Sequence, residues 1–245
     1  TESDHGDFIR RCYDFLGIEL TIDEYPEHKV IKFSQAAYAK KVVTRFDGDC
    51  PDDWMRKRKR NHPYTVEGKN SDDCDFSKTE EKVENLSPAE REKREAVIKG
   101  IQEIRGALQY IIMTRPDLVC PLKIATLLPT KVQQLQALKN IVRYLRDTIS
   151  YGIIYRPRND VAHLKFGMAI SNLHKVMAHA DASWCSKNTL SGVLLTVNQN
   201  VIHGVSLTQA ETPLSTSEAE NCSISEGARR VIPLHNVVFE FIENC

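Results

Sequence analysis

The sequence has no net charge, no apolar stretch long enough to cross a membrane, and no closely spaced pair of cysteines. Its 33 basic residues balance 33 acidic residues, so no overall field favours binding to nucleic acid or to an anionic membrane. The seven cysteines are scattered without metal-ligand spacing, and the N-terminus has no signal-peptide pattern. These absences predict a reduced, intracellular protein with no membrane partner.

The length and the apolar content are sufficient for a substantial core. With 245 residues, of which 41% are apolar, the chain can form one large domain or two modest ones. The first residue is Thr1 rather than Met, and we therefore expect the chain to be a piece of a longer protein.

The first part of the chain predicts two strands and a helix, followed by a long irregular segment. Apolar residues favour strands at 15–20 and 30–33, joined through a turn near 26–28. Residues 35–46 carry apolar side chains at helical spacing. Residues 47–90 are rich in Asp, Gly, Pro, Asn and Ser, which predicts a loop or linker that is partly disordered.

Three helices are predicted next, at 88–113, 118–128 and 131–146. Ser87 is placed as the N-cap of the first, with a Glu three residues later. The Thr114-Arg-Pro-Asp117 segment ends that helix, because a residue before proline disfavours the helical conformation. An apolar stripe from Leu135 to Leu145 predicts that the third helix packs into a core.

After Ser150 the apolar period changes towards two, as is typical of strands. A final helix begins near Thr216 and is expected to be interrupted or kinked at Pro233. Helices followed by strands predict an α-rich unit and then an α/β or α+β unit, with a boundary near 155–160. The expected strands are residues 151–155, 161–166, 175–182, 192–197 and 201–205.

Two acidic residues stand beside small residues near the C-terminus. Asp181 lies in a predicted strand, and Glu220 lies in the predicted final helix. Carboxylates from a strand and a helix can form a Mg²⁺ site, because this ion prefers hard oxygen ligands. The alternative is that both are ordinary surface acids. His179 shares the strand face of Asp181 by alternation, and a structural role for it competes with a role as a ligand.

Seven segments in sequence order resemble the C-terminal part of a copia-type retrotransposon Pol polyprotein, just after the polymerase palm. Each is weak alone, but they follow the order of the family across nearly the whole chain. They are Phe15-Leu-Gly-Ile-Glu19, Ser34-Gln35 with Tyr38, Ile104-Arg-Gly-Ala-Leu-Gln-Tyr110, Thr114-Arg-Pro-Asp117, Val142-Arg-Tyr-Leu-Arg-Asp-Thr148, Ala180-Asp-Ala-Ser-Trp184 and Ser215-Thr-Ser-Glu-Ala-Glu220.

The resemblance implies an α+β or α/β fold with four segments. Residues 1–46 correspond to the end of the reverse-transcriptase palm and the start of the thumb, and residues 47–90 to a linker. Residues 91–155 correspond to a helical connection, and residues 156–245 to part of an RNase H-like mixed sheet with helices. The parent activities are RNA-directed DNA synthesis and hydrolysis of RNA in an RNA–DNA hybrid.

The resemblance also implies site residues, a cofactor and partners. Asp181 and Glu220 correspond to RNase H carboxylates that are catalytic and bind metal, with Mg²⁺ or Mn²⁺ as the cofactor if the site is completed. The palm aspartates are expected upstream of Thr1, and the remaining acids downstream of Cys245. The implied partners are an RNA–DNA hybrid or template–primer and the rest of the polyprotein, in cytoplasmic virus-like particles, in the nucleus or in both.

Departures from the family pattern leave a second hypothesis open. An aromatic residue usually follows the second carboxylate, whereas this chain has Asn221. The third strand usually carries a Trp where this chain has His203. These changes favour a divergent or relic copy that is a non-catalytic nucleic-acid-binding or scaffold module.

Two basic groups are candidates for phosphate contacts. One is the run of Arg56, Lys57, Arg58, Lys59 and Arg60, which could also be a nuclear-import sequence or a solvated loop. The other is Lys139, Arg143 and Arg146 on the third predicted helix, on the side opposite its apolar stripe.

Overall fold

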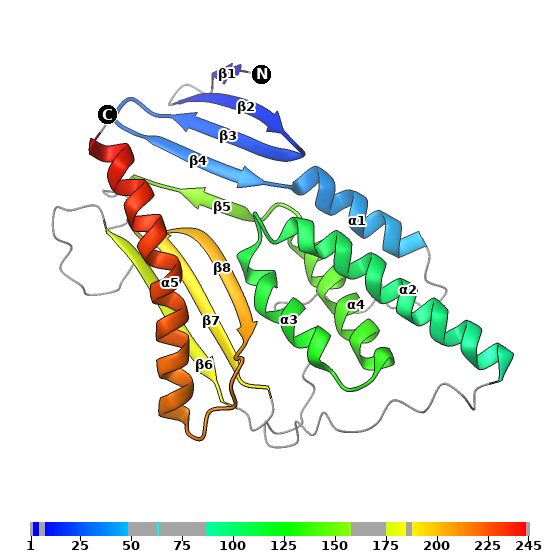
Figure 1. Cartoon of the computed structure of the whole chain (residues 1–245). Helices are drawn as coiled ribbons and strands as arrows, with labels where there is room; N and C mark the ends of the chain where they lie inside the picture. The colour runs from blue at the N-terminus through cyan, green and yellow to red at the C-terminus, as the bar shows by residue number, and fades with distance from the viewer. Residues whose placement is uncertain are drawn as a thin grey trace. The chain divides into compact units, whose positions relative to one another are not determined.

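A computed structural model of the chain describes residues 2–4, 8–48, 63, 87–157, 175–184 and 188–243. The chain forms two compact units, one made of residues 1–35 with 152–245 and the other of residues 36–151. The elements are helices and two antiparallel sheets (Figure 1). The predicted mixed α and β fold class is confirmed.

The first sheet has five antiparallel strands in the order β1-β2-β3-β4-β5. Strands β2 and β3 meet at a two-residue turn in which Leu16 and Gly17 have φ values of 53° and 72°. The prediction of a single strand over residues 15–20 was therefore wrong, because the apolar run continues through a turn that Gly17 makes possible. The bounds are β1 Glu2–Asp4, β2 Ile9–Phe15, β3 Ile18–Glu24, β4 Lys29–Ser34 and β5 Gly152–Tyr155.

Strand β5 joins this sheet from far along the chain. It pairs with β4 so that Gly152 lies opposite Ser34. A Cβ atom on Gly152 would lie only 2.2 Å from the carbonyl oxygen of Phe33. Glycine is therefore required for the close approach of these two strands.

The helical unit is built around α4, which contacts α1, α2 and α3. Its core includes Leu108 of α2 and the predicted stripe residues Leu138, Val142 and Leu145 of α4, all of which are buried. The bounds are α1 Ala36–Gly48, α2 Pro88–Ile111, the 3₁₀ turn η4 Pro116–Leu118, α3 Val119–Leu127 and α4 Lys131–Asp147.

The ends of these helices are fixed by local hydrogen bonds. The predicted N-cap Ser87 accepts a bond from the backbone N–H of Glu90, and the Glu90 carboxylate accepts one from the backbone of Ser87. Thr130 and Gln133 form the same reciprocal arrangement at the start of α4. Each arrangement satisfies backbone donors that the first helical turn leaves unpaired.

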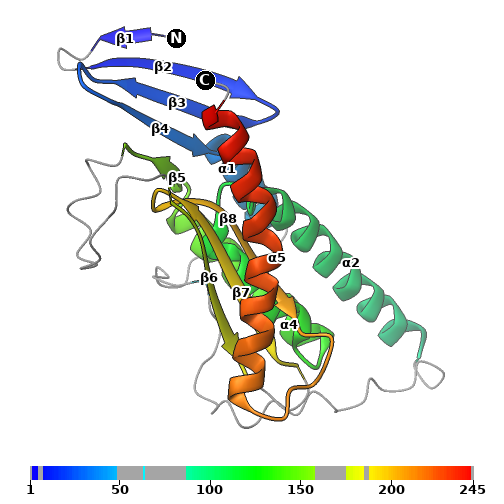
Figure 2. The ribbon, with the colours of Figure 1, turned by 60° about the vertical axis from the view of Figure 1, so that its left-hand side comes forward.

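The second sheet has three antiparallel strands in the order β6-β7-β8, and helix α5 packs on β6 and β7 (Figures 1 and 2). Helix α5 runs through Pro233 as one element. Of the two outcomes predicted for Pro233, the interruption was therefore wrong, and the kink stays a prediction. Pro233 lies on the exposed side of the helix, where the carbonyl that loses its partner can bond to water. The bounds are β6 Val176–Ser183, β7 Leu190–Val197, β8 Asn200–Thr208 and α5 Thr216–Glu243.

Some predictions fall on other parts of the chain. The strand predicted at 161–166 and most of the linker predicted at 47–90 lie outside the described residues. Strands β1 and β2 were not predicted, although apolar side chains alternate at Ile9, Tyr13 and Phe15. The division into four family segments stays a prediction.

Candidate metal-carboxylate site

Helix α5 fits closely on strand β6 because the contact surfaces carry small residues. A Cβ atom on Gly227 would lie 3.4 Å from the Cβ of Ala178 and 3.5 Å from the Cβ of Ala180. Ala178 and Ala180 therefore face the helix. Since side chains alternate along a strand, the side chain of Asp181 lies on the opposite face of the sheet, where it is exposed.

Hydrogen bonds fix the first turns of α5 to the sheet. The hydroxyl of the fully buried Ser223 donates to the backbone carbonyl of Asp181 at 2.6 Å. The Gln209 amide donates to the Ser191 hydroxyl at 2.9 Å and to the Ala219 carbonyl at 2.8 Å. The strand that carries Asp181 is thus bonded to the helix that carries Glu220.

The two predicted carboxylates lie on adjacent elements but in different surroundings. Glu220 is three residues before Ser223 on α5 and is half-buried at the flank of the packed face. The helix meets the backbone of Asp181, while the Asp181 carboxylate is on the other face of the strand. The structure confirms the strand and helix positions, and the convergence of the two carboxylates on one ion stays a prediction.

The donor chemistry suits Mg²⁺ or Mn²⁺, but the number of donors does not. Carboxylate oxygens are suitable hard ligands, and Mg²⁺ requires a nearly octahedral set. Within the described ranges, no group of three or more His, Cys, Asp and Glu residues is placed so that it could hold a metal ion. Asp181 and Glu220 therefore supply at most part of a ligand set.

The neighbouring polar residues have structural contacts. The Nε2 atom of His179 is 3.4 Å from the Thr196 hydroxyl, which fits the structural role considered for this histidine. The Ser215 hydroxyl accepts from the backbone N–H of Glu218, whose carboxylate accepts from the backbone N–H of Leu214 at 2.6 Å. Ser215 therefore caps α5, and Glu218 bonds to the residue that precedes the cap. The spacing of Ser215 and Glu218 could have predicted this arrangement.

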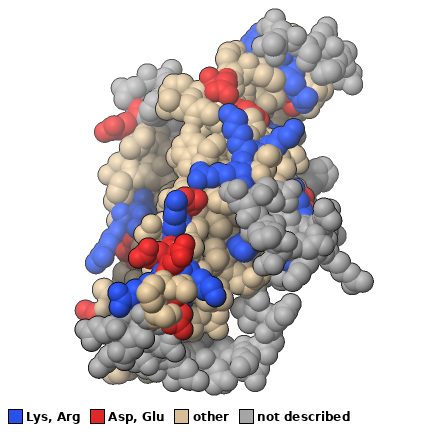
Figure 3. Space-filling model, turned by 90° about the vertical axis from the view of Figure 1, so that its right-hand side faces the viewer, with Lys and Arg blue, Asp and Glu red and all other residues tan. Residues whose placement is uncertain are grey.

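The basic residues predicted on α4 are not an open row of cations. Arg143 is buried, with 4% of its surface exposed, and donates to the Asn140 side chain at 3.2 Å. Arg146 pairs with Asp147 at 2.8 Å, and Lys139 is half-buried. The run from Arg56 to Arg60 lies outside the described residues. On the face drawn in Figure 3, basic and acidic side chains are interspersed.

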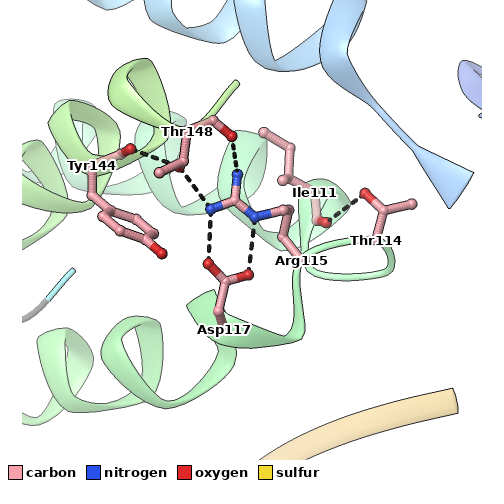
Figure 4. Close-up of polar contacts among 6 residues, drawn as sticks. All are labelled: Ile111, Thr114, Arg115, Asp117, Tyr144 and Thr148. Atoms are coloured by element: carbon pink, nitrogen blue, oxygen red, sulfur yellow. Dashed lines mark hydrogen bonds and ion pairs between the residues drawn. The ribbon is translucent and has the colours of Figure 1, made fainter. Parts of the chain in front are cut away.

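A polar network of the helical unit surrounds Arg115, in the segment between α2 and α3 (Figure 4). Its guanidinium donates to both carboxylate oxygens of Asp117, at 2.9 and 2.7 Å. It also donates to the Thr148 carbonyl at 2.9 Å and to the Thr148 hydroxyl at 2.8 Å. The Tyr144 and Tyr151 rings lie 5.5 and 5.3 Å from its central carbon.

This network has a structural role. The cation lies against the C-terminal end of α4, where helix carbonyls favour positive charge. Burial, followed by the charge of Asp117, raises the pKa of Tyr144 above its ordinary value. The network fixes the exit of α4 to the turn that follows α2.

The chain is an α+β protein in which one predicted carboxylate lies on a strand and the other on the helix packed against that strand. Secreted RxLR effector protein 161 of Plasmopara viticola is 28% identical to this chain over 134 residues, 52% of the chain and 85% of the effector. The retrovirus-related Pol polyprotein from transposon RE1 of Arabidopsis thaliana is 34% identical over 129 residues, 50% of the chain and 8% of the polyprotein.

The chain is thus similar, over half its length, to a part of a retrotransposon Pol polyprotein. No protein-family model matches the sequence, and no solved structure matches it. Among the described helices, none combines the length and the apolar character that crossing a bilayer requires.

Proposed function

We propose that the chain is a fragment of a retrotransposon Pol protein from the reverse-transcriptase and RNase H region. Residues 1–46 then belong to the end of the palm and the start of the thumb, residues 91–155 to the connection, and residues 156–245 to the first part of the RNase H domain. The observation that carries the proposal is the order β6-β7-β8-α5, in which the Asp181 strand is bonded to the Glu220 helix through Ser223. The similarity to the transposon polyprotein supports it.

The proposed substrate is an RNA–DNA hybrid, recognised through its shape and its phosphates rather than its base sequence. When bound, paired divalent ions activate water and stabilise the leaving oxygen in hydrolysis of this kind. Asp181 and Glu220 would hold Mg²⁺ or Mn²⁺ once further carboxylates complete the ligand set. Two carboxylates do not hold two ions roughly 3.5–4 Å apart, and the isolated chain is therefore expected to be inactive.

A hydrolysis assay tests the proposed site. A labelled RNA–DNA hybrid is incubated with Mg²⁺ or Mn²⁺ and with the chain, its Asp181→Asn or Glu220→Gln variant, or a control. Glu211→Gln is the matched control because Glu211 is an exposed acid in the loop before α5. We expect no cleavage by any form. Cleavage that Asp181→Asn and Glu220→Gln abolish and Glu211→Gln retains would show that the site is already complete.

A binding assay tests the substrate class. We expect weak affinity for the hybrid that falls steeply as salt rises, because phosphate contacts release counterions. Binding that does not depend on salt, or that is absent at low salt, would exclude the proposed contact with nucleic acid.

A second candidate function is a non-catalytic module, either a domesticated copy or a genomic relic. The match that covers 85% of the effector favours it, because a protein little longer than the matched segment carries a similar sequence. Asn221 and His203, where the family usually has aromatic residues, also support this candidate. Such a nucleic-acid-binding or scaffold module would not cleave the hybrid even after the missing carboxylates are supplied by a longer reading frame.

A further inference from the structure

The first sheet has one apolar and one polar face. Strand register places Tyr13, Leu20, Phe33 and Ile153 opposite one another in a row that crosses β2, β3, β4 and β5. Because these residues are directly opposite, they lie on the same side of the sheet. We call the side that carries this row the apolar face.

Neighbouring rows extend the apolar face. Two residues along, the row consists of Arg11 on β2 followed by the apolar residues Ile22, Ile31 and Tyr155 on β3, β4 and β5, and at the turn Phe15 is opposite Ile18. Phe33 and Tyr155 pack edge to face, with ring centroids 5.3 Å apart. The face is therefore continuous from the β2–β3 turn to β5.

The opposite face of the same strands is polar. Arg10 donates two hydrogen bonds to Asp23, at 2.6 and 2.8 Å. The Ser34 hydroxyl donates to Glu19 at 3.0 Å. This contrast is typical of an antiparallel sheet that buries one face and exposes the other.

The apolar face is open along β2. Phe15 is 71% exposed, Tyr13 is 51% exposed and Ile9 is 43% exposed. Given the surface areas of such side chains, these three alone present roughly 300 Å² of apolar surface. With the half-buried residues of the other strands, the open apolar area is on the order of 500 Å² per chain, at the upper end of patches on monomeric proteins.

Two such faces together have nearly the area that a stable dimer requires. Packing one copy on another would bury on the order of 1,000 Å² from the faces alone, and the surrounding residues bring this close to the lower end of standard interfaces, about 1,200 Å². Sheets commonly pack face to face at about 10 Å separation.

The charges at one end of the face also suit a second copy. Glu24 pairs with Arg11 at 2.9 Å and with Lys29 at 2.6 Å. This end therefore carries both signs, and Glu24 of one copy can meet Arg11 or Lys29 of the other without an excess of like charge.

We propose that the apolar face of β2–β5 pairs two copies of this chain face to face. The pairing uses residues that the proposed nuclease site does not include, so it does not depend on the proposed function. A polar rim around an apolar centre is the usual arrangement of a specific protein interface.

Sedimentation equilibrium of the full chain over a concentration series tests the proposal. Tyr13→Lys and Phe15→Lys place a charge on the exposed part of the apolar face. Cys12→Lys adds the same charge at an exposed position of the neighbouring polar face, and it is the matched control. We expect a dimer for the unmodified chain and for Cys12→Lys, and a dissociation constant raised at least tenfold for the other two variants.

Circular dichroism verifies that each variant remains folded. If Tyr13→Lys or Phe15→Lys unfolds the chain, Tyr13→Ser provides a milder test of the same position. A monomer at every concentration would refute the proposal. So would a dimer that all the variants retain, or a monomer whose apolar face binds only a longer segment of a Pol protein.

Discussion

Replacement of Arg115 by Lys should destabilise the helical unit although it retains the positive charge. Arg115 is only 2% exposed and makes four hydrogen bonds. Lysine cannot reproduce the planar, two-bond contact with Asp117 and also reach both oxygens of Thr148. The two tyrosine ring contacts with the guanidinium are lost as well.

The expected magnitude follows from how much each partner is buried. Breaking a buried ion pair by removing one partner typically costs about 3–5 kcal/mol. The Asp117 side chain is 37% exposed, so water can solvate its carboxylate and the cost should be lower. We expect about 2–3 kcal/mol for Arg115→Lys and about 1–2 kcal/mol for Asp117→Asn, because Arg115 then keeps Thr148.

Urea denaturation followed by circular dichroism measures these free energies of unfolding. A double-mutant cycle of Arg115→Lys with Asp117→Asn isolates the coupling of the pair, expected to be at least about 1 kcal/mol. Arg45→Lys is a control, since Arg45 makes an exposed ion pair with Glu103 at 3.2 Å and should cost under about 1 kcal/mol. If Arg115→Lys costs no more than Arg45→Lys, the structural role inferred for the network is refuted.

Four further predictions concern backbone fit and ionisation. Gly152→Ala should lower the free energy of unfolding by about 2 kcal/mol or more, because its Cβ would lie 2.2 Å from a carbonyl oxygen of β4; thermal unfolding measures this loss. Gly106→Ala, whose Cβ meets nothing within 4 Å, should instead be neutral or stabilising by up to about 1 kcal/mol in helix α2. Burial raises the pKa of Tyr144, so the contribution of Tyr144 to stability is present below the ordinary pKa and is lost as pH rises through the folded-state pKa. An absorbance titration of Tyr144→Phe should lose one of the phenolate transitions that lie above the ordinary range. Hydrogen bonds from Ser87 lower the pKa of Glu90. The stability that the capping pair contributes is therefore present above the ordinary pKa of a glutamate and is lost as pH falls through the lowered pKa. Glu90→Gln should weaken the dependence of the free energy of unfolding on acid pH.

The helices could be predicted from the sequence because their signals are local. Ser87 and Glu90 mark the start of α2, and the Arg115-Pro segment marks its end, as observed. Helix α5 also began at the predicted residue, but its continuation past Pro233 depended on the proline facing solvent. Local sequence does not reveal which side of a helix will pack against a sheet.

The strand pairings could not be predicted in the same way because they connect distant residues. The β2–β3 turn was hidden in an apolar run, and the pairing of β5 with β4 joins residues separated by the whole helical unit. Alternation placed His179 and Asp181 on one face of β6. The contact between Ser223 and the Asp181 backbone could not be predicted, since it depends on how α5 crosses the sheet.

The pairing of Ser34 with Gly152 has a consequence for how the chain can be divided. It brings together the residues that precede and follow the helical unit 36–151, which is therefore an insertion within the other unit. Such an insertion can be excised as a self-contained piece and its flanks joined by a short linker, because the two ends are neighbours. A cut at the boundary first expected, near residues 155–160, would instead separate the sheet that contains β4 and β5 from the rest of the unit to which it belongs.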